Sequence, residues 1–489
     1  MNHRPLVVVG AGLVFSLAFP PADIGIVAAF ALIPLLWAWR DAGPLQAALL
    51  GYLFGLAYLG PLMWGLHHVG YFGYIALAVA AATGYALTGA FVGLFQRHGV
   101  SSPLLTAAIW TMFEGLRGQW PIGGLAWGEV ANAFHDIGPV RSLASWGGIA
   151  LVSFVVVAWN GFVLDLLLAP AGVRSARRRA LTGLITIVVV TMAADLGRIR
   201  PRETGEVRFA MLQAWVDEHA PTTSPEAEQR ATEAHLALAG RLRGKYDLIV
   251  FPESALARDP EADPALRQAL VAIADTHDAV VLVNARHLGS GGQLFNANLA
   301  YDPDGRLQGI YAKQHLVPFG EFVPLRDELS FIGDLRQIPY DFTAGTKQRL
   351  FDVGAHPMGT VICYESAYPR LVREFVQEGA ELLVVSTSDR SYGRSGIAAA
   401  HFAVAQMRAA ETGRPVLQAA ISGVSGVIDA DGDARDLTGL FETTITEGRV
   451  ITRSGDTPYV RFGDWVLAVC GLGLIATAIV GVRRRLAAS

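Results

Sequence analysis

The chain has 489 residues, of which 52% are hydrophobic and 17% are charged, and its formal net charge is −4. This length exceeds one ordinary domain, and soluble proteins carry roughly 25% charged residues, so the composition favours a membrane protein of two or three domains. No basic stripe with interleaved aromatic residues occurs, so no nucleic-acid partner is expected. The two cysteines, Cys363 and Cys470, predict neither a zinc cluster nor a structural disulfide.

Eight apolar runs are long enough, or nearly so, to cross a membrane, which takes about 20 residues. In chain order they are 5–22, 24–39, 44–66, 71–95, 103–116, 145–168, 179–197 and 464–482. The fifth run is the shortest and ends among charged residues, so the count of eight depends on it. The first run leads into the second without a convincing cleavage site, which favours a span over a signal peptide. The sequence therefore predicts an all-α bundle of eight transmembrane helices, seven of them within residues 1–200.

Positive charges fall on alternate connections between these runs. They are Arg4, Arg40, Arg97, the cluster within 174–179 and the terminal cluster 483–485. The opposite loops, around 20–23 and 67–73, contain no lysine or arginine. Because short cytoplasmic loops carry the excess of lysine and arginine, both termini are predicted to be cytoplasmic. The long segment between the seventh and eighth runs is then extracytoplasmic.

Residues 201–460 show a different pattern, in which short β-branched runs alternate with amphipathic stretches. The predicted strands are 207–215, 248–253, 280–284, 360–365 and 382–386, and the predicted helices are 225–245, 264–276 and 398–412. Turn sequences at 303–305 and 431–432 join neighbouring strands. This alternation predicts one α/β layered domain, followed by the eighth helix and a tail within 461–489.

Three residues of this domain are suited to covalent catalysis. Glu253 follows an apolar strand, Lys313 closes another, and Cys363 stands where a strand turns into a helix-like segment. Each has an ordinary alternative: a solvated loop glutamate, a surface lysine, or a small buried thiol. A thiol at a helix N-terminus near an ammonium is expected to have a lowered pKa. A carboxylate can take and return its proton, and the lysine can stabilise an oxyanion.

These residues occur in the order and contexts of the carbon–nitrogen hydrolase, or nitrilase, triad. The phrases Pro-Glu-Ser at 252–254, Lys-x-x-Leu-Val-Pro-Phe-Gly-Glu at 313–321 and Cys-Tyr-Glu at 363–365 resemble the apolipoprotein N-acyltransferase family. The arrangement of seven spans, an α/β domain and a last span is also similar to that family. The resemblance implies a four-layer αββα nitrilase-like domain in the periplasm, inserted between helices seven and eight at a bacterial inner membrane. It implies Cys363 as nucleophile, Glu253 as general base and Lys313 as oxyanion support.

The resemblance also implies supporting residues around the triad. Glu321 would orient or assist the lysine, while Tyr364 and Glu365 would flank the nucleophile and shape the pocket. Glu365 has an alternative as a hydrogen-bond acceptor behind the site. The family phrase Asn-Asp-x-Trp-Phe-Gly keeps here only Asp389 and its glycine, with Tyr392 as an aromatic replacement. This departure leaves the catalytic residues intact and bears on how the lipid or the acceptor is bound.

Two further phrases after the fifth run look like the family's membrane-facing outer loop. They are Glu-Gly-Leu-Arg-Gly, which contains Arg117, and Gly-Leu-Ala-Trp-Gly, which contains Trp127. Their alternative is interfacial anchoring, because Trp and Arg favour that depth of the bilayer. The histidines show no metal-ligand spacing, and His401 is interpreted as structural. No phosphate-binding glycine loop occurs, so neither a metal nor another cofactor is expected.

The implied reaction is a ping-pong acyl transfer. Cys363 takes an acyl chain from a phospholipid, with phosphatidylethanolamine as the expected donor, and forms a thioester. The α-amine of the S-diacylglyceryl-cysteine of a diacylated lipoprotein then receives the chain, in the last step of lipoprotein maturation. One alternative is a membrane-tethered amidase or nitrilase that hydrolyses small amides. Another is a transport or scaffold protein, which the intact triad and the scarcity of charge within the spans disfavour.

Overall fold

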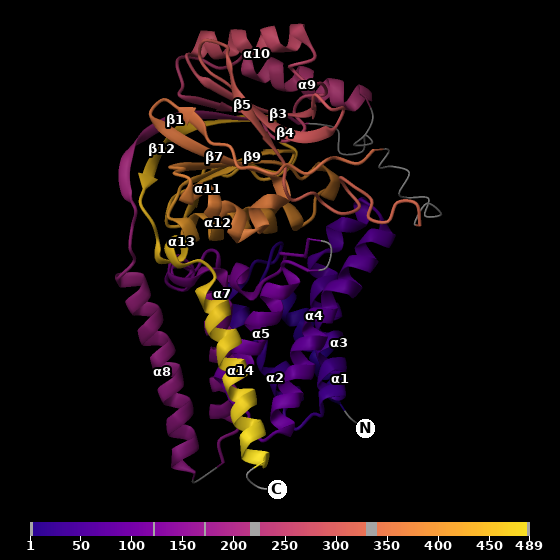
Figure 1. Cartoon of the computed structure of the whole chain (residues 1–489), viewed down its shortest axis with the longest axis vertical. Helices are drawn as coiled ribbons and strands as arrows, with labels where there is room; N and C mark the ends of the chain where they lie inside the picture. The colour runs from indigo at the N-terminus through magenta and orange to yellow at the C-terminus, as the bar shows by residue number, and fades with distance from the viewer. Residues whose placement is uncertain (1–2, 121–122, 171–172, 216–224, 329–339, 487–489) are drawn as a thin grey trace. The chain divides into compact units, whose positions relative to one another are not determined.

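The computed structural model describes residues 3–120, 123–170, 173–215, 225–328 and 340–486, with side chains up to 481. The chain divides into two compact units. The helical unit comprises Met1–Trp64, Tyr71–Ile199 and Arg461–Ser489, and the sheet unit comprises Gly65–Gly70 and Arg200–Val460 (Figure 1).

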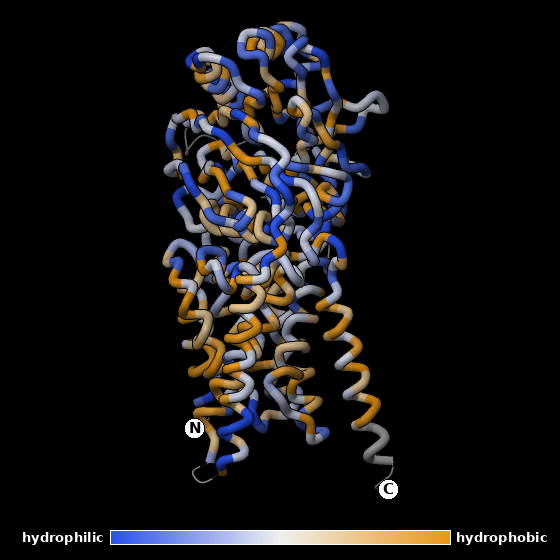
Figure 2. The backbone as a smooth tube through the Cα atoms, turned by 90° about the vertical axis from the view of Figure 1, so that its left-hand side faces the viewer, coloured by the Kyte–Doolittle hydropathy of each residue, from blue (hydrophilic) through white to orange (hydrophobic). Residues whose placement is uncertain are grey.

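The helical unit is built from apolar helices, and Figure 2 shows hydrophobic residues along them. They are α1 (Arg4–Ser16), α2 (Ile33–Trp39), α3 (Pro44–Leu62), α4 (Tyr71–Arg97), α5 (Pro103–Arg117), α6 (Gly138–Arg141), α7 (Ala144–Leu167), α8 (Arg174–Leu196) and α14 (Trp465–Leu486). Within the described part of the chain, α3, α4, α7 and α8 are long and apolar enough to cross a membrane. The prediction of several apolar helices is therefore confirmed.

The other predicted spans form shorter helices. The run 5–22 yields α1, which has only 13 residues, and the run 103–116 yields α5, which has 15. The run 24–39 is divided between a 3₁₀ helix, Gly25–Ala29, and the seven-residue α2. Proline accounts for part of this division, because α2 has a proline in its first turn, where the missing N–H costs nothing. Eight full-length membrane-crossing helices are thus not established by these lengths.

The helices α8 and α14, which flank the sheet unit in the sequence, meet at one tryptophan. Trp146, at the start of α7, donates its Nε1–H to the carbonyl oxygen of Ala194 near the end of α8 at 3.0 Å. Trp465, at the start of α14, donates its own Nε1–H to the carbonyl oxygen of Trp146 at 2.9 Å. In Figure 1 the first residues of α1 and the last residues of α14 lie at the other end of the helical unit.

Among its described residues, the sheet unit contains two six-stranded sheets with helices on their outer faces (Figure 1). The first sheet has the order β12 (Thr444–Ser454), β1 (Arg202–Gln213), β2 (Leu248–Val250), β3 (Val280–Leu288), β4 (Leu294–Tyr301) and β5 (Leu307–Ala312). The second has the order β11 (Ala434–Arg435), β10 (Gly426–Ile428), β9 (Val416–Ile421), β8 (Leu382–Ser388), β7 (His356–Ile362) and β6 (Phe351–Val353). The helices α9 (Pro225–Ala239) and α10 (Pro264–His277) cover the first sheet, and α11 (Pro369–Gln377) and α12 (Ile397–Thr412) cover the second. A short helix, α13 (Pro458–Phe462), leads to α14.

Every predicted strand and helix of this unit is present, but several ends differ. The predicted strand 360–365 stops at Ile362, because Cys363 has a φ of +53° and begins the 3₁₀ helix η5 (Cys363–Ala367). The predicted strand 248–253 stops at Val250. The predicted helix 225–245 stops at Ala239. Because these strands end early, Glu253 lies in the loop after β2, and Cys363 lies in η5 after β7.

Parallel pairing brings these loops to common edges. The strands β7, β8 and β9 pair in parallel, as do β1, β2 and β3. The carboxyl ends of parallel strands open on the same edge of a sheet, where α/β folds place functional groups. Glu253 follows β2, Cys363 follows β7 and Asp389 follows β8.

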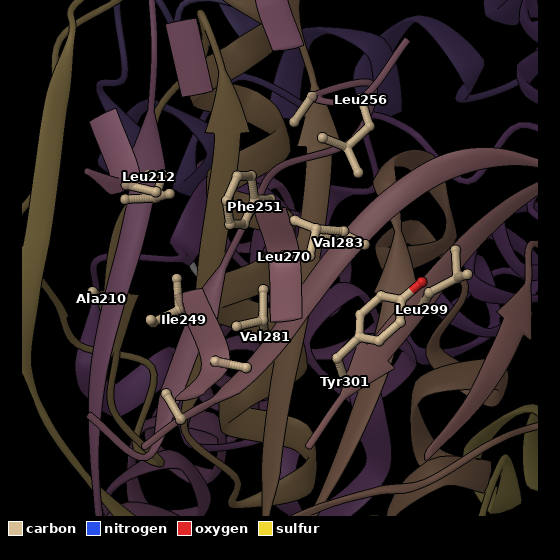
Figure 3. Close-up of a cluster of buried hydrophobic side chains, with 14 of the residues drawn as sticks. Ala210, Leu212, Ile249, Phe251, Leu256, Leu270, Val281, Val283, Leu299 and Tyr301 are labelled. Carbon is tan, nitrogen blue, oxygen red and sulfur yellow. The ribbon is translucent and has the colours of Figure 1, made fainter. Parts of the chain in front are cut away.

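A hydrophobic core lies between the first sheet and its two helices (Figure 3). Its members include Ala210, Leu212, Ile249, Phe251, Leu256, Leu270, Val281, Val283, Leu299 and Tyr301. Leu270, on α10, is fully buried among strand residues from β2, β3 and β4. Burial of such a side chain is worth roughly 1.5–3 kcal/mol, so this layer holds the first sheet in place.

Leu270→Ala is expected to destabilise the sheet unit by about 2–5 kcal/mol, because it removes buried methyl groups and leaves a cavity. The midpoint of thermal unfolding of the full chain in detergent should fall measurably. Leu288→Ala is the matched control, since Leu288 is 58% exposed at the end of β3. Equal midpoints for the two variants would contradict this assignment of the core.

Candidate active site

The ammonium of Lys313 lies between two carboxylates. Its Nζ is 2.9 Å from Glu321 Oε1 and 3.4 Å from Glu253 Oε1. Lys313 is 1% exposed. Burial lowers the pKa of Lys313, but the carboxylates of Glu321 and Glu253 more than offset it, so the pKa lies well above its ordinary value. The lysine is therefore a permanent buried cation.

The backbone around Lys313 is held on both sides. β5 ends at Ala312, after which the Lys313 N–H donates to the Asn296 carbonyl at 2.8 Å. The Gly345 N–H donates to the Lys313 carbonyl at 2.7 Å. The phrase that follows turns back on itself, with Phe319 at a φ of +60°, so that Glu321 Oε2 accepts the Val317 N–H at 2.8 Å. This turn returns Glu321 to the lysine eight positions earlier.

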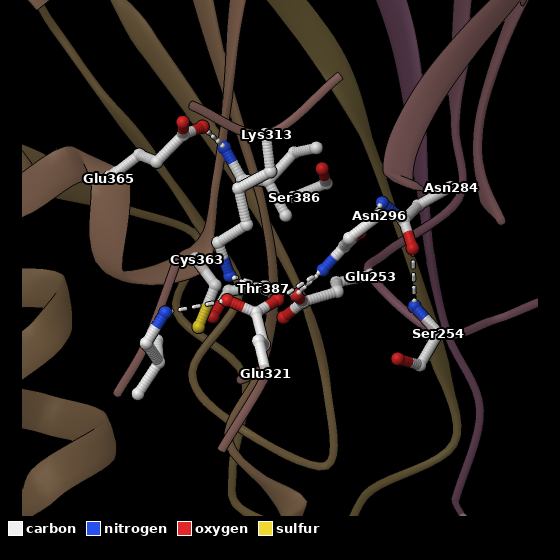
Figure 4. Close-up of polar contacts among 12 residues, drawn as sticks. Glu253, Ser254, Asn284, Asn296, Lys313, Glu321, Cys363, Glu365, Ser386 and Thr387 are labelled. Carbon is white, nitrogen blue, oxygen red and sulfur yellow. Dashed lines mark hydrogen bonds and ion pairs between the residues drawn. The ribbon is translucent and has the colours of Figure 1, made fainter. Parts of the chain in front are cut away.

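Asn296 joins the two carboxylates, and the sequence reasoning missed it. Its Nδ2 donates to Glu253 Oε1 at 2.8 Å and to Glu321 Oε1 at 2.7 Å (Figure 4). Asn284 donates in turn to Asn296 Oδ1 at 2.8 Å and accepts the Ser254 N–H at 2.9 Å. The available signal was the alternation of asparagines with apolar residues along β4, which places Asn296 and Asn298 on one face of the strand.

Cys363 lies at the turn from β7 into η5, and its thiol is oriented towards the same polar cluster (Figure 4). The Thr387 hydroxyl makes a hydrogen bond with the thiol. Burial raises the pKa of Cys363 well above its usual range, and the carboxylate of Glu253 raises it further against the opposing effect of Lys313. The prediction of a lowered thiol pKa is therefore wrong. Its premise fails because η5 is a single turn of five residues and the site holds more negative than positive charge.

The charge balance explains the neutral thiol. One ammonium and two carboxylates leave this buried cluster at −1, and a resting thiolate would make it −2. A second uncompensated negative charge in a water-poor interior is costly. The thiol is thus expected to lose its proton only when a group such as Glu253 receives it.

Glu365 lies behind the site and ties its two halves together. Its Oε1 accepts the backbone N–H groups of Gln314 at 2.6 Å and His315 at 3.1 Å. Its Oε2 accepts the Ile362 N–H at 2.8 Å, and the Tyr311 hydroxyl lies 3.0 Å from both oxygens. Burial raises the pKa of Glu365 to about 7, despite the opposing effect of these hydrogen bonds. The geometry favours the interpretation of Glu365 as an acceptor that joins the lysine loop to the nucleophile strand.

Two tyrosines flank the nucleophile. Tyr364 is half-buried and packs edge-on against Tyr368, with ring centroids 5.3 Å apart. Burial raises the pKa of Tyr392 well above its usual value, and the negative charge of Asp389 adds to this effect. The Tyr392 phenol therefore stays neutral beside the nucleophile.

Asp389 and His401 form a buried pair below Cys363. Asp389 Oδ1 lies 3.2 Å from His401 Nδ1, and His401 Nε2 lies 3.0 Å from the Cys363 carbonyl oxygen. His401 was interpreted as structural from its place in an amphipathic helix, and nothing local in the sequence reveals its contact with the nucleophile. Gly393 has a φ of +55°, and a Cβ there would come within 3.0 Å of His68 Nε2, so the glycine kept in this phrase is required by its backbone.

Arg117 and Trp127 belong to the helical unit, and both are buried. Arg117 Nη1 donates to the Trp127 carbonyl at 2.6 Å, and its Nη2 lies 3.8 Å from Glu129 Oε1. These contacts fold the loop after α5 back onto that helix. Neither side chain is exposed as an interfacial anchor would be, in contrast to Trp120, which is 62% exposed.

Two family models match the chain. The Apolipoprotein N-acyltransferase N-terminal domain matches residues 11–162, and Carbon-nitrogen hydrolase matches residues 209–451. An apolipoprotein N-acyltransferase of Methylococcus capsulatus is 33% identical over 507 residues, which cover 99% of this chain and 97% of the relative. The chain belongs to the apolipoprotein N-acyltransferase family. A relative of the same name from Geobacter metallireducens is 27% identical over 98% of this chain and 95% of its own length.

Membership of this family confirms the resemblance drawn from the phrases around Glu253, Lys313 and Cys363. The chain is a membrane protein and an acyltransferase of the nitrilase superfamily. The two stacked sheets with outer helices are the αββα nitrilase-like fold that the resemblance implied.

The neutral resting thiol can be tested by alkylation. In a Cys470→Ala background Cys363 is the only thiol, and its rate of reaction with iodoacetamide should still be rising at pH 9. A raised pKa keeps the thiolate a small fraction of the total, and that fraction grows tenfold with each pH unit below the pKa. The same variant unfolded in denaturant should instead show a midpoint of about 8.5. A plateau of the folded chain below pH 8 would show a preformed thiolate and contradict the charge argument.

Proposed function

We propose that this chain transfers an acyl chain from a phospholipid to the N-terminal S-diacylglyceryl-cysteine of a diacylated lipoprotein, through a thioester on Cys363. The observation that carries the proposal is the buried cluster of thiol, ammonium and carboxylates in a chain of this family. Membrane helices suit the proposed substrates, because both the donor, expected to be phosphatidylethanolamine, and the acceptor are lipids held in the bilayer.

In the first half-reaction the Cys363 sulfur attacks the ester carbonyl carbon of the phospholipid as Glu253 takes the thiol proton. The oxyanion that forms is stabilised by the Lys313 ammonium, which is already in place and charged. Collapse breaks the bond to the glycerol oxygen, and Glu253 returns the proton to that oxygen. The products are a thioester and a lysophospholipid.

In the second half-reaction the neutral α-amine of the acceptor attacks the thioester carbonyl. Glu253 takes a proton from the amine nitrogen, and the carbon–sulfur bond breaks. The proton then passes to the departing Cys363 thiolate, which restores the neutral thiol. Every atom and proton is accounted for by the chain, the phospholipid and the lipoprotein.

The remaining residues support this chemistry in the proposal. Glu321 orients Lys313, with Asn296 holding both carboxylates in register. Tyr364 and Tyr392 line the site beside the nucleophile. Asp389 fixes the segment after β8 that carries Tyr392. Glu365 keeps the lysine loop against the nucleophile strand. In the helical unit, Arg117 and Trp127 are proposed to form the outer loop of the family, with the Arg117 guanidinium donating to the Trp127 carbonyl.

We further propose the topology of the chain. Residues 1–200 form seven transmembrane helices, residues 201–460 form the periplasmic catalytic domain, and residues 461–489 form the eighth helix and a tail at the bacterial inner membrane. The alternating arginines support cytoplasmic termini, because short cytoplasmic loops carry the excess of lysine and arginine. Two observations support this arrangement: the first residues of α1 and the last residues of α14 lie at the same end of the helical unit (Figure 1), and α8 and α14 meet at Trp146.

Cys363→Ala is expected to abolish formation of triacylated lipoprotein, because it removes the acyl carrier. Loss of a covalent nucleophile should lower the rate by about 1,000-fold or more. The assay follows conversion of a diacylated lipoprotein by purified protein in phospholipid, and Cys470→Ala serves as the matched cysteine control. Triacylated product at the parent rate from Cys363→Ala would exclude this mechanism.

Glu253→Gln is expected to slow thioester formation by about 100- to 10,000-fold at neutral pH, because the buried thiol loses its base. The rate of thioester formation by this variant should then rise about tenfold per pH unit. Without Glu253 the thiolate forms only by loss of the thiol proton to solvent, and the thiol pKa is raised. The measurement is the first-order rate of acyl-enzyme formation between pH 6 and pH 9. A parent-like, flat profile in Glu253→Gln would remove Glu253 from the role of base.

The alternative of a membrane-tethered amidase uses the same cluster with water as the second substrate. Purified protein incubated with small amides should release no ammonia above the level of Cys363→Ala. With phospholipid and diacylated lipoprotein, nearly all acyl chain lost from the donor should appear on the lipoprotein. Release of most of that chain as free fatty acid would favour the hydrolase instead.

A further inference from the structure

The imidazole of His401 contacts the backbone of the nucleophile. Its Nε2 is 3.0 Å from the Cys363 carbonyl oxygen and 3.0 Å from Ser366 Oγ. Its Nδ1 is 3.2 Å from Asp389 Oδ1 and 3.3 Å from Thr387 Oγ1. His401 projects from α12 and is 2% exposed, so these contacts are made without competition from solvent.

The hydrogen-bond partners of the His401 ring indicate which of its two nitrogens carry a hydrogen. A backbone carbonyl only accepts hydrogen bonds, so the nitrogen facing Cys363 carries a hydrogen. An ionised carboxylate also only accepts, so the nitrogen facing Asp389 carries one as well. Burial lowers the pKa of His401, but Asp389 and the Cys363 carbonyl outweigh it and leave the pKa raised. The two acceptors and the raised pKa favour the imidazolium form, in which the hydrogen bond to the nucleophile backbone is charge-assisted.

The backbone of Cys363 has a strained conformation that a hydrogen bond to its carbonyl can hold in place. A φ of +53° is uncommon for a residue with a side chain, and a strained conformation of this kind costs of order 1–3 kcal/mol. A charged hydrogen bond to the carbonyl of the same residue opposes relaxation of that turn. The Thr387 hydroxyl, which contacts the Cys363 thiol, lies against the other side of the ring. One imidazole thus contacts both the backbone of the nucleophile and the hydroxyl that holds its sulfur.

We propose that His401 is a positioning residue that fixes the carbonyl and, through Thr387, the sulfur of Cys363 for attack on the acyl ester. This inference rests on the proposed function, because it takes Cys363 as the nucleophile. His401 acts through Cys363 and Thr387, so its loss changes the rate of the acylation step and leaves phospholipid binding unchanged.

Two substitutions separate the contacts of the ring. The side-chain nitrogen of Gln reaches the position of Nε2, so His401→Gln keeps a donor to the Cys363 carbonyl. The nitrogen of Asn reaches only the position of Nδ1, so His401→Asn keeps a donor to Asp389 and loses Cys363. Both are neutral and leave Asp389 without a charged partner, and each keeps one of the two contacts. A faster rate for His401→Gln than for His401→Asn therefore reports the contact with the nucleophile.

The measurement is the first-order rate of acyl-enzyme formation, by rapid quench and intact mass, as a function of the phospholipid concentration. His401→Asn should lower the saturating rate by about 10- to 100-fold, the effect of losing a charge-assisted hydrogen bond. The half-saturating phospholipid concentration should not change. His401→Gln should recover a large part of the lost rate. The rate of iodoacetamide alkylation of Cys363 gives a second readout. It should be highest in the parent, lower in His401→Gln and lowest in His401→Asn.

His235→Gln is the matched control for loss of a buried histidine. His235 is fully buried on α9 and bonds only to backbone groups, Ala231 O at 2.7 Å and Ala214 N at 3.4 Å, among its described contacts. It should lower the unfolding midpoint and leave the acylation rate of folded protein unchanged. Equal rates for His401→Asn, His401→Gln and the parent would overturn the positioning role. If the parent itself forms no adduct on Cys363, the proposed function fails instead, and alkylation alone then decides whether His401 positions the thiol.

Discussion

A buried ammonium shared between two carboxylates sets the chemistry of this site. Lys313 contacts both Glu253 and Glu321, and the three charges do not cancel. The excess negative charge keeps the lysine protonated and the neighbouring Cys363 thiol neutral. In the proposed mechanism the site is ready to stabilise an oxyanion at all times, but it makes a thiolate only as the acyl ester arrives. A reactive nucleophile is thereby kept from water between turnovers.

Residues at the strand ends of both sheets form this cluster. Glu253 leaves β2, Lys313 leaves β5 and Cys363 leaves β7, so the cluster draws on both sheets. Buried side-chain contacts link the sheets just behind it, where Asn298 on β4 donates to Thr360 on β7 at 2.7 Å. A shift of one sheet against the other would separate the base from the nucleophile. Core packing on the outer face of the first sheet therefore bears on catalysis as well as on stability.

Much of this arrangement could be predicted from the sequence, because strand ends and specific phrases are local signals. The phrases around Glu253, Lys313 and Cys363 indicated both the fold and the candidate triad. The thiol pKa could not be predicted, since it depends on burial and on a charge balance among residues far apart in the chain. Asn296 and His401 escaped notice for the same reason: their partners, Glu253 and Cys363, lie 43 and 38 positions away. In the helical unit, hydropathy located the apolar runs but not the points at which their helices end.

The central claim is that the acyl chain is carried on Cys363. It is tested most directly by the intact mass of the parent chain after mixing with a phospholipid of known acyl composition, before any acceptor is added. The account predicts one adduct with the mass of one acyl chain on the peptide that contains Cys363. Hydroxylamine should remove it, and a diacylated lipoprotein should discharge it into an equal amount of triacylated product. Triacylated product formed without any such adduct would contradict the account.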